Sequence, residues 1–174
     1  YSSQNLGANM YVHTQGDSHP VFAFQGVGEI YYNASGDPSN ANQGMFFVPP
    51  LSEDAQDDIN NIAEIDKIGN RNFTGNMSIV YNEDASLEVN IGNTSNGQYE
   101  YNSVDLTGIN PNTVSGKKGY LTVTLTGIDG DIQVKSDDEL YVAYYNANSA
   151  ATSGGFYAGF ATPPATAIDL TLQS

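Results

Sequence analysis

The sequence predicts an all-β protein: an antiparallel β-sandwich, jelly-roll-like or Ig-like, with at most one short helix. Apolar and polar residues alternate along many short segments, which is typical of strands with one buried and one solvated face. Asn, Ser, Asp and Gly fill the intervals between these segments, as they do in turns. The 12 Tyr and 7 Phe supply large side chains for a core, although only 39% of the 174 residues are hydrophobic.

The predicted strands can be placed in chain order from this alternation. The clearest are Met10–Thr14, Pro20–Gln25, Met77–Tyr81, Leu87–Ile91, Tyr99–Val104, Tyr120–Thr126, Asp131–Lys135 and Glu139–Asn146. Asp129-Gly130 favours a tight hairpin between the strands on either side of it, and residues 135–139 read as the next turn. We therefore expect the last three strands to form a meander.

Residues 52–68 carry a different pattern, with an isoleucine at every third position from Ile59 to Ile68. Ser52 is a suitable N-cap, and Gly69 is suited to end a helix. However, Asn60-Asn61 are weak helix formers, and a spacing of three drifts around an α-helix. The segment is predicted to be either a short helix or an ordered loop.

The chain is expected to be a single module spanning residues 1–174, cut at both ends from a longer surface protein. Its two ends resemble each other, because Ala23 and Ala143 occupy equivalent places in two hairpin-like phrases. In both copies an Asn/Ser/Gly-rich loop and an aromatic-then-Pro-Pro phrase follow. This predicts an internal repeat of residues 10–50 and 131–164.

Charge and composition exclude several classes of function. The net charge of −15 makes nucleic acid and anionic membranes poor partners. No apolar run is long enough for a membrane helix, which excludes membrane insertion by that route. Cysteine is absent, so there is no disulfide framework or thiolate chemistry. An acidic, Lys-poor chain rich in Asn, Thr, Tyr and Gly indicates an extracellular, cell-surface location.

Three long phrases of the chain resemble a known family. The segments Gln43–Leu51, Ile59–Gly69 and Glu139–Phe160 are similar to a module of very large Bacteroidetes cell-surface proteins of the gliding-motility and adhesin type. These proteins leave the cell through the type IX secretion system. Pro20-Val-Phe-Ala-Phe-Gln25 also resembles the IgGFc-binding-protein N-terminal type of β-repeat. The resemblance implies surface display and adhesion, with neighbouring modules of the same chain as partners, and implies no catalytic residues.

Catalytic motifs are not evident in the sequence. The two histidines, His13 and His19, lie near one predicted hairpin, and no G-x-S-x-G accompanies them. They are better explained as surface or turn residues. Twenty acidic residues supply many carboxylate pairs by chance, so a glycan-acting hydrolase is only the third choice. We expect a protein that is not an enzyme.

A calcium ion is the one cofactor that the sequence suggests. Its acidic turns could supply the several oxygen ligands that Ca²⁺ requires, although turns also favour Asp and Asn for backbone reasons. The predicted ligands are Asp129 and Asp131, flanking one glycine, with Asp137 and Asp138 of the following turn as a second choice. None of the clusters has EF-hand spacing.

Carbohydrate binding is the leading functional prediction. Sugar sites combine aromatic rings with planar hydrogen-bonding groups, and two Tyr-Tyr-Asn phrases offer both where a strand meets a polar loop. The predicted ligand-binding residues are Tyr31, Tyr32, Asn33, Tyr144, Tyr145 and Asn146. One tyrosine of each pair is expected in the core and the other at the surface. The predicted function is a non-catalytic adhesin module that binds a glycan or another cell-surface component, with a structural spacer as the alternative.

Overall fold

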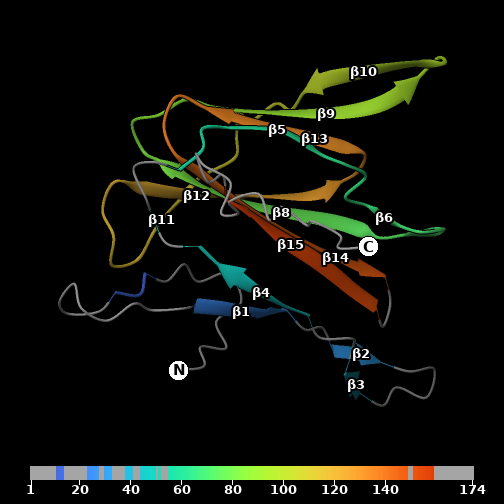
Figure 1. Cartoon of the computed structure of the whole chain (residues 1–174), viewed down its shortest axis with the longest axis horizontal. Coiled ribbons are helices and arrows are strands. Elements are labelled where there is room, and N and C mark those ends of the chain that lie inside the picture. Colours follow the sequence, from blue (N-terminus) through green and yellow to red (C-terminus); the bar gives the residue numbers. More distant parts are fainter. Residues whose placement is uncertain are drawn as a thin grey trace, which may run out of the picture.

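Two antiparallel sheets form the body of the protein. The computed structural model describes residues 11–13, 23–27, 30–32, 38–40, 44–49, 51, 55–148 and 151–158. Figure 1 shows the two large sheets as two layers. The predicted all-β antiparallel sandwich is confirmed, and none of the described segments is helical. Accordingly, the described residues include no helix of the length and apolarity that a membrane span needs.

The described strands belong to two large sheets and three small ones. The five-stranded sheet has the order β11 (Asn112–Thr113), β12 (Tyr120–Ile128), β8 (Thr74–Asn82), β14 (Leu140–Asn148), β15 (Ala151–Ala158). The four-stranded sheet has the order β10 (Gln98–Ser103), β9 (Leu87–Ser95), β13 (Asp131–Ser136), β5 (Asp58–Ile62). The small sheets pair β1 (Ala23–Val27) with β4 (Gly44–Val48), β2 (Ile30–Tyr32) with β3 (Pro38–Asn40), and β6 (Lys67–Ile68) with β7 (Arg71–Asn72).

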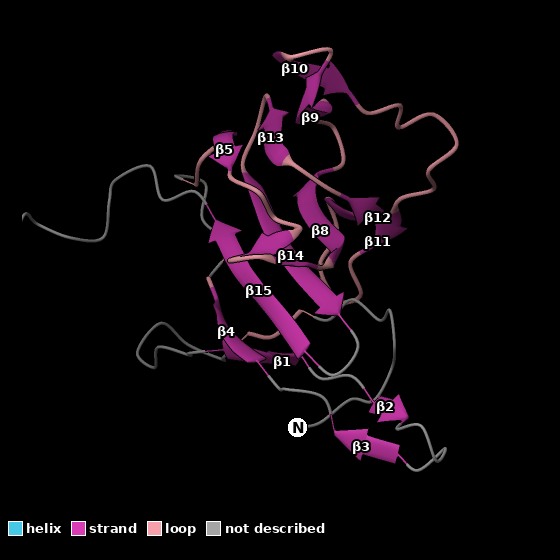
Figure 2. Ribbon diagram, turned by 90° about the vertical axis from the view of Figure 1, so that its right-hand side faces the viewer, coloured by secondary structure: helices cyan, strands magenta, loops and turns pink. Residues whose placement is uncertain are grey.

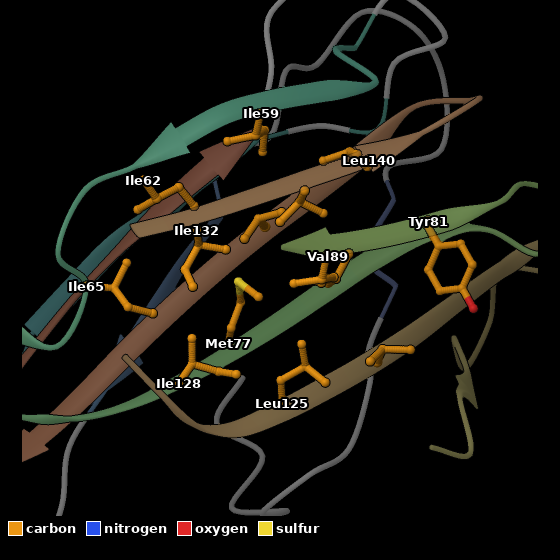
Figure 3. Close-up of a cluster of buried hydrophobic side chains, with 14 residues drawn as sticks. Ile59, Ile62, Ile65, Met77, Tyr81, Val89, Leu125, Ile128, Ile132 and Leu140 are labelled. Carbon is orange, nitrogen blue, oxygen red and sulfur yellow. The ribbon is translucent and has the colours of Figure 1, made fainter. Parts of the chain in front are cut away.

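The core lies between the two large sheets. β8 is central in its sheet, and every second residue from Gly75 to Tyr81 is buried, as period-2 alternation requires. Its Met77 and Ile79 are fully buried, as are Val89 of β9 and Ile132 of β13 in the opposite layer. Figure 3 shows Met77, Val89 and Ile132 among the side chains that meet between the sheets. Burying each such side chain contributes roughly 1.5–3 kcal/mol, which makes this cluster the main source of stability.

Most of the predicted strands are confirmed. The segments predicted at 77–81, 87–91, 99–104, 120–126, 131–135 and 139–146 coincide with β8, β9, β10, β12, β13 and β14, within a few residues at the ends. The segment predicted at 20–25 overlaps β1. Residues 11–13 form no strand, whereas the Tyr11 main-chain N–H donates to the Ser115 carbonyl at 3.2 Å. Residues 10 and 14 lie outside the described part.

The predicted hairpin at Asp129-Gly130, and with it the meander, is wrong. β12 pairs with β8 and β11, whereas β13 pairs with β9 and β5 in the other sheet. Gly130 has φ +78°, and its N–H donates to the Asp66 carboxylate at 2.8 Å. Residues 129–130 therefore carry the chain from one layer to the other. The turn at 135–139 does the same between β13 and β14.

The step of three from Ile59 to Ile62 comes from a strand with a bulge, Ile65 follows that strand, and Ile68 is exposed, so the helical interpretation is wrong for the described residues. Ile62 lies opposite Ile132, but Ile59 lies opposite Val134, so three residues of β5 match two of β13. Such a bulge lets residues three apart face the same core. Ile59, Ile62 and Ile65 are all buried. Ser52, the proposed N-cap, lies outside the described residues.

The two hairpin-like phrases of the predicted repeat are not paired as expected. In the second copy, β13 and β14 lie in different sheets. In the first copy, β1 pairs with β4, and Ala23 lies opposite Val48. The equivalent Ala143 lies opposite Phe156 of β15, so in both copies the strand that contains the alanine pairs with the later aromatic strand. β4 also lies next to β15 (Figure 2). The repeat itself stays a prediction.

Candidate functional site

The outer face of the four-stranded sheet carries an exposed pair of tyrosines. All six residues of β10 are exposed, because this strand pairs only with β9 at the sheet edge. Figure 2 shows β10 far from the five-stranded sheet. In the register, Tyr101 lies opposite Gly92 of β9, and Gly92 lies opposite Asp131 of β13. Since alternate residues of a strand share a face, Tyr99 lies on the same side of β10 as Tyr101.

The absence of a side chain at Gly92 makes room for both rings. A Cβ atom at position 92 would lie 2.8 Å from Cε1 of Tyr101 and 2.9 Å from Cζ of Tyr99. The two rings meet edge to face, with centroids 5.5 Å apart and planes at 88°. This is a favourable aromatic geometry. Tyr99 keeps 50% and Tyr101 37% of its surface exposed, so the pair forms an aromatic corner open to solvent.

Hydrogen bonds fix the orientation of both tyrosines. The Tyr99 hydroxyl donates to Oδ2 of Asp131, and Oδ1 of Asp131 accepts the main-chain N–H of Glu64 at 2.8 Å. The Tyr101 hydroxyl reaches Oδ1 of Asn61 at 3.5 Å. Partial burial of the Tyr99 hydroxyl, together with the Asp131 hydrogen bond, raises the pKa of Tyr99 above its ordinary value. The hydrogen bond to Asp131 orients the Tyr99 ring, and the Tyr99 hydroxyl keeps its proton to a higher pH than that of a free tyrosine.

Acidic and amide side chains lie on the chain segments next to this corner. Asp129 is exposed, and its Oδ1 lies 3.5 Å from the amide nitrogen of Asn93. Asp66 accepts the Gly130 N–H beside them. Glu64 forms an ion pair with Lys67 at 3.2 Å. We call Tyr99, Tyr101, Asn61, Gly92 and Asp131 the tyrosine face.

The tyrosine face combines the two chemical features that sugar recognition requires. An exposed aromatic ring can stack against the C–H face of a pyranose. Carboxylate and amide groups such as Asp131 and Asn61 accept and donate hydrogen bonds in a plane. Four strands, β5, β9, β10 and β13, contribute these groups, so the sheet itself holds them in place. The arrangement is suited to binding a polar ligand with apolar patches.

The sequence-predicted residues Tyr144, Tyr145 and Asn146 lie in β14. Tyr144 packs against the hydrophobic core, and Tyr145 is half-buried. Asn146 is only 1% exposed, and its side-chain amide donates to the Ile65 carbonyl. This asparagine therefore connects β14 to the segment after β5 and does not reach the surface.

The other predicted ligand-binding residues lie in a separate small sheet. Tyr31 and Tyr32 belong to β2 and lie opposite Ser39 and Pro38 of β3. Asn33 lies outside the described residues. The structure therefore places the described residues of the two Tyr-Tyr-Asn phrases in different sheets.

The predicted metal ligands already accept hydrogen bonds from the protein. Asp131 belongs to the tyrosine face described above, and Asp129 accepts from the Asn93 amide at 3.5 Å. Asp137 accepts the Ser86 main-chain N–H at 2.6 Å, and Asp138 accepts the Asn82 amide at 2.9 Å. Within the described ranges, no three acidic or histidine side chains converge as a metal site would require. Calcium binding stays a prediction.

A second polar cluster joins the β13–β14 turn to the start of β12. Glu139 is buried, and the Tyr120 hydroxyl donates to its Oε1. Burial and this hydrogen bond raise the pKa of Tyr120. The cluster connects strands of different chain position at one end of the sandwich, so its role is architectural.

Sequence reasoning missed the two tyrosines of the face, although it predicted their strand. The available signal was a strand with no apolar face: Gln98–Ser103 alternates tyrosine only with polar residues. Such a strand cannot contribute to a core on its polar side, and its aromatic side then needs another explanation. Asp131 was predicted as a metal ligand, and the structure places it next to Tyr99.

Comparisons with known proteins give no relative for this chain. No family model, no curated protein and no solved structure matches it. The resemblance to Bacteroidetes surface modules therefore stays a prediction.

Proposed function

We propose that this chain is a non-catalytic, extracellular glycan-binding module of a cell-surface adhesin, and that the tyrosine face is its binding site. The sequence resemblance and the acidic, Lys-poor composition support surface display. The geometry of Tyr99 and Tyr101 supports carbohydrate as the ligand. Neighbouring modules of the same long chain would carry the remaining contacts of the adhesin.

The exposed tyrosine corner is the observation that carries this proposal. Both rings lie on a strand none of whose residues is buried, so the core does not account for them. A single exposed aromatic side chain needs no explanation. Two exposed rings that are held in one orientation and do not pack in the core indicate a binding surface. Gly92 and Asp131 provide the space and the hydrogen bond that hold Tyr99 in this position.

A glycan array tests the proposal directly. We expect a reproducible hit that the double variant Tyr99→Ala/Tyr101→Ala abolishes, because stacking requires the rings. Tyr99→Phe keeps the ring and loses only the hydroxyl, so it should retain much of the binding. Circular dichroism of each variant checks that the sheets are intact.

Tyr145→Ala is the matched comparison, because it removes a half-buried tyrosine of the other sheet. We expect it to leave binding unchanged. Loss of binding in Tyr145→Ala alone would move the site to the phrase that the sequence first suggested. Silence of the unaltered protein on broad arrays would favour the structural spacer over a binding module.

A further inference from the structure

The charge around the tyrosine face restricts the class of glycan that it can bind. Asp131 accepts the Tyr99 hydroxyl, and its other oxygen accepts the main-chain N–H of Glu64. Asp66 and Asp129 lie on the neighbouring segments, where they contact Gly130 and Asn93. The cation that accompanies this group is Lys67, and it is engaged by Glu64 at 3.2 Å. Carboxylates therefore outnumber ammonium groups next to the aromatic corner.

Two further lysines are engaged elsewhere in the molecule. Lys135 lies on the same sheet, but it forms an ion pair with Asp58 at 3.5 Å. Lys117 lies near the start of β12, against the rings of Tyr11 and Tyr120. The sequence has only five basic residues. A ligand bearing sulfate or carboxylate would therefore be repelled at this face, and few cationic contacts would offset the cost of removing water from its charged group.

An ammonium group would meet the opposite conditions. Cations are attracted to the faces of tyrosine rings within about 6 Å of the centroid. The chain already contains such an arrangement: Nζ of Lys117 lies 5.8 Å from the Tyr11 ring centroid and 5.6 Å from that of Tyr120. The tyrosine face offers two rings with planes at 88° and a carboxylate hydrogen-bonded to one of their hydroxyls. The negative charge of this carboxylate would add to the attraction of the rings for an ammonium group.

We propose that the tyrosine face selects glycans with free amino groups, such as chains of β-linked glucosamine, over their neutral and acidic counterparts. This inference rests on the proposed glycan-binding function. One ring stacks on the sugar, and the ammonium lies between the second ring and the carboxylate of Asp131. Acetylation of the amine removes the charge and keeps the backbone of the sugar, so it isolates the electrostatic contribution.

The experiment titrates the protein calorimetrically with matched oligosaccharides of one length. These are a β-1,4-glucosamine hexamer, its N-acetylated form, the corresponding glucose hexamer and a hexauronate. We expect the amino hexamer to bind about tenfold more tightly than the acetylated one, as for one charge-assisted contact. The hexauronate should bind weakest, and added salt should reduce the preference for the amine.

Two variants separate a specific contact from general attraction to an acidic protein. Asp131→Asn should remove most of the preference for the amine. Asp84→Asn removes the same charge in the exposed turn before β9 and should leave the preference unchanged. Asp129→Asn removes a charge two residues along the chain and provides a second test if Asp131→Asn disturbs the hydrogen bond to Glu64.

Each other outcome has a definite meaning. Equal binding of amino and acetylated hexamers, or preference for the hexauronate, would overturn this inference and leave the glycan-binding function standing. An equal loss in Asp84→Asn and Asp131→Asn, or amine binding that survives Tyr99→Ala/Tyr101→Ala, would reduce it to polycation attraction and overturn it. No binding of any hexamer, with array hits elsewhere, overturns only the inference; silence on the array as well would overturn both.

Discussion

β8 and β10 are both regular strands of this protein, but only the side chains of β8 pack in the core. β8 is central in the five-stranded sheet, and its alternate residues are buried. β10 lies at the edge of the four-stranded sheet, and none of its residues is buried. The core fully explains the sequence of β8 but leaves Tyr99 and Tyr101 of β10 unexplained. The comparison teaches that function is to be sought where a well-formed strand contributes nothing to packing.

The largest expected difference follows from truncating one side chain in each strand. Ile79→Ala in β8 removes a fully buried side chain and should destabilise the fold by roughly 2–5 kcal/mol. Tyr101→Ala in β10 loses mainly a cross-strand contact, worth about 1 kcal/mol or less. Urea unfolding measures both values. Equal destabilisation by the two variants would show that β10 is part of the stabilising core after all.

The same contrast can be made with glycine. A Cβ at Gly75 of β8 would press against the main-chain carbonyl of Ile128, whereas one at Gly92 of β9 would meet the ends of the Tyr99 and Tyr101 side chains. Backbone cannot yield easily, so Gly75→Ala should cost about 1–3 kcal/mol. Side-chain ends can swing away, so Gly92→Ala should cost less.

Gly92→Ala should instead weaken glycan binding, because it moves the rings from their place over the sheet. Thermal melts and array binding of the two alanine variants give the two readouts. A Gly92→Ala protein with full binding would contradict the role of the glycine in positioning the tyrosines.

These contrasts also show which features local sequence could predict. β8 was predicted correctly because Met77, Ile79 and Tyr81 alternate within one segment, and alternation is a local property. The bulge in β5 was not, since period three arises only from its pairing with β13. The layer crossing at Asp129-Gly130 was missed for a similar reason: hairpin and crossover share the same turn residues.

The candidate site was harder to predict than the fold because its parts are distant in sequence. Tyr99, Gly92 and Asp131 become neighbours only through the β10-β9-β13 register. The Tyr-Tyr-Asn phrases attracted attention because their residues are adjacent in sequence, but Asn146 proved to be a buried structural amide. Adjacency in sequence on a strand places successive side chains on opposite faces, so it is a poor guide to a site on a sheet.

Acid should act on the architecture rather than on the tyrosine face. The main-chain N–H of Ser86 lowers the pKa of Asp137, and hydrogen bonds with Glu139 lower that of Asp138. A carboxylate with a lowered folded-state pKa stabilises the fold above its unfolded pKa, and this stability is lost as pH falls through the folded value. The melting temperature should therefore decrease as the pH is lowered from about 5 to about 3.

Asp137→Asn should weaken this pH dependence, since it removes one of the linked protons, whereas Asp84→Asn serves as the charge-matched control. Melts across this pH range check the expectation. A midpoint that rises on acidification would show that relief of the net negative charge of the chain outweighs the loss of these hydrogen bonds.

The smallest expected effect concerns calcium. The question is whether the carboxylates of the acidic turns are explained by the architecture, as β8 is, or are left unexplained, as β10 is. Asp137 and Asp138 are accounted for by their hydrogen bonds to Ser86 and Asn82, as β8 is by the core. Asp129 is exposed beside the tyrosine face, so calcium should act there if it binds. A weak site filled by about 2–5 mM Ca²⁺ adds on the order of 1 kcal/mol, which raises the melting midpoint by a few degrees. Melts in EDTA, Ca²⁺ and Mg²⁺ measure the shift, and Asp129→Asn should abolish it while Asp137→Asn preserves it. Identical melting midpoints in all three solutions would exclude a structural calcium site at either turn.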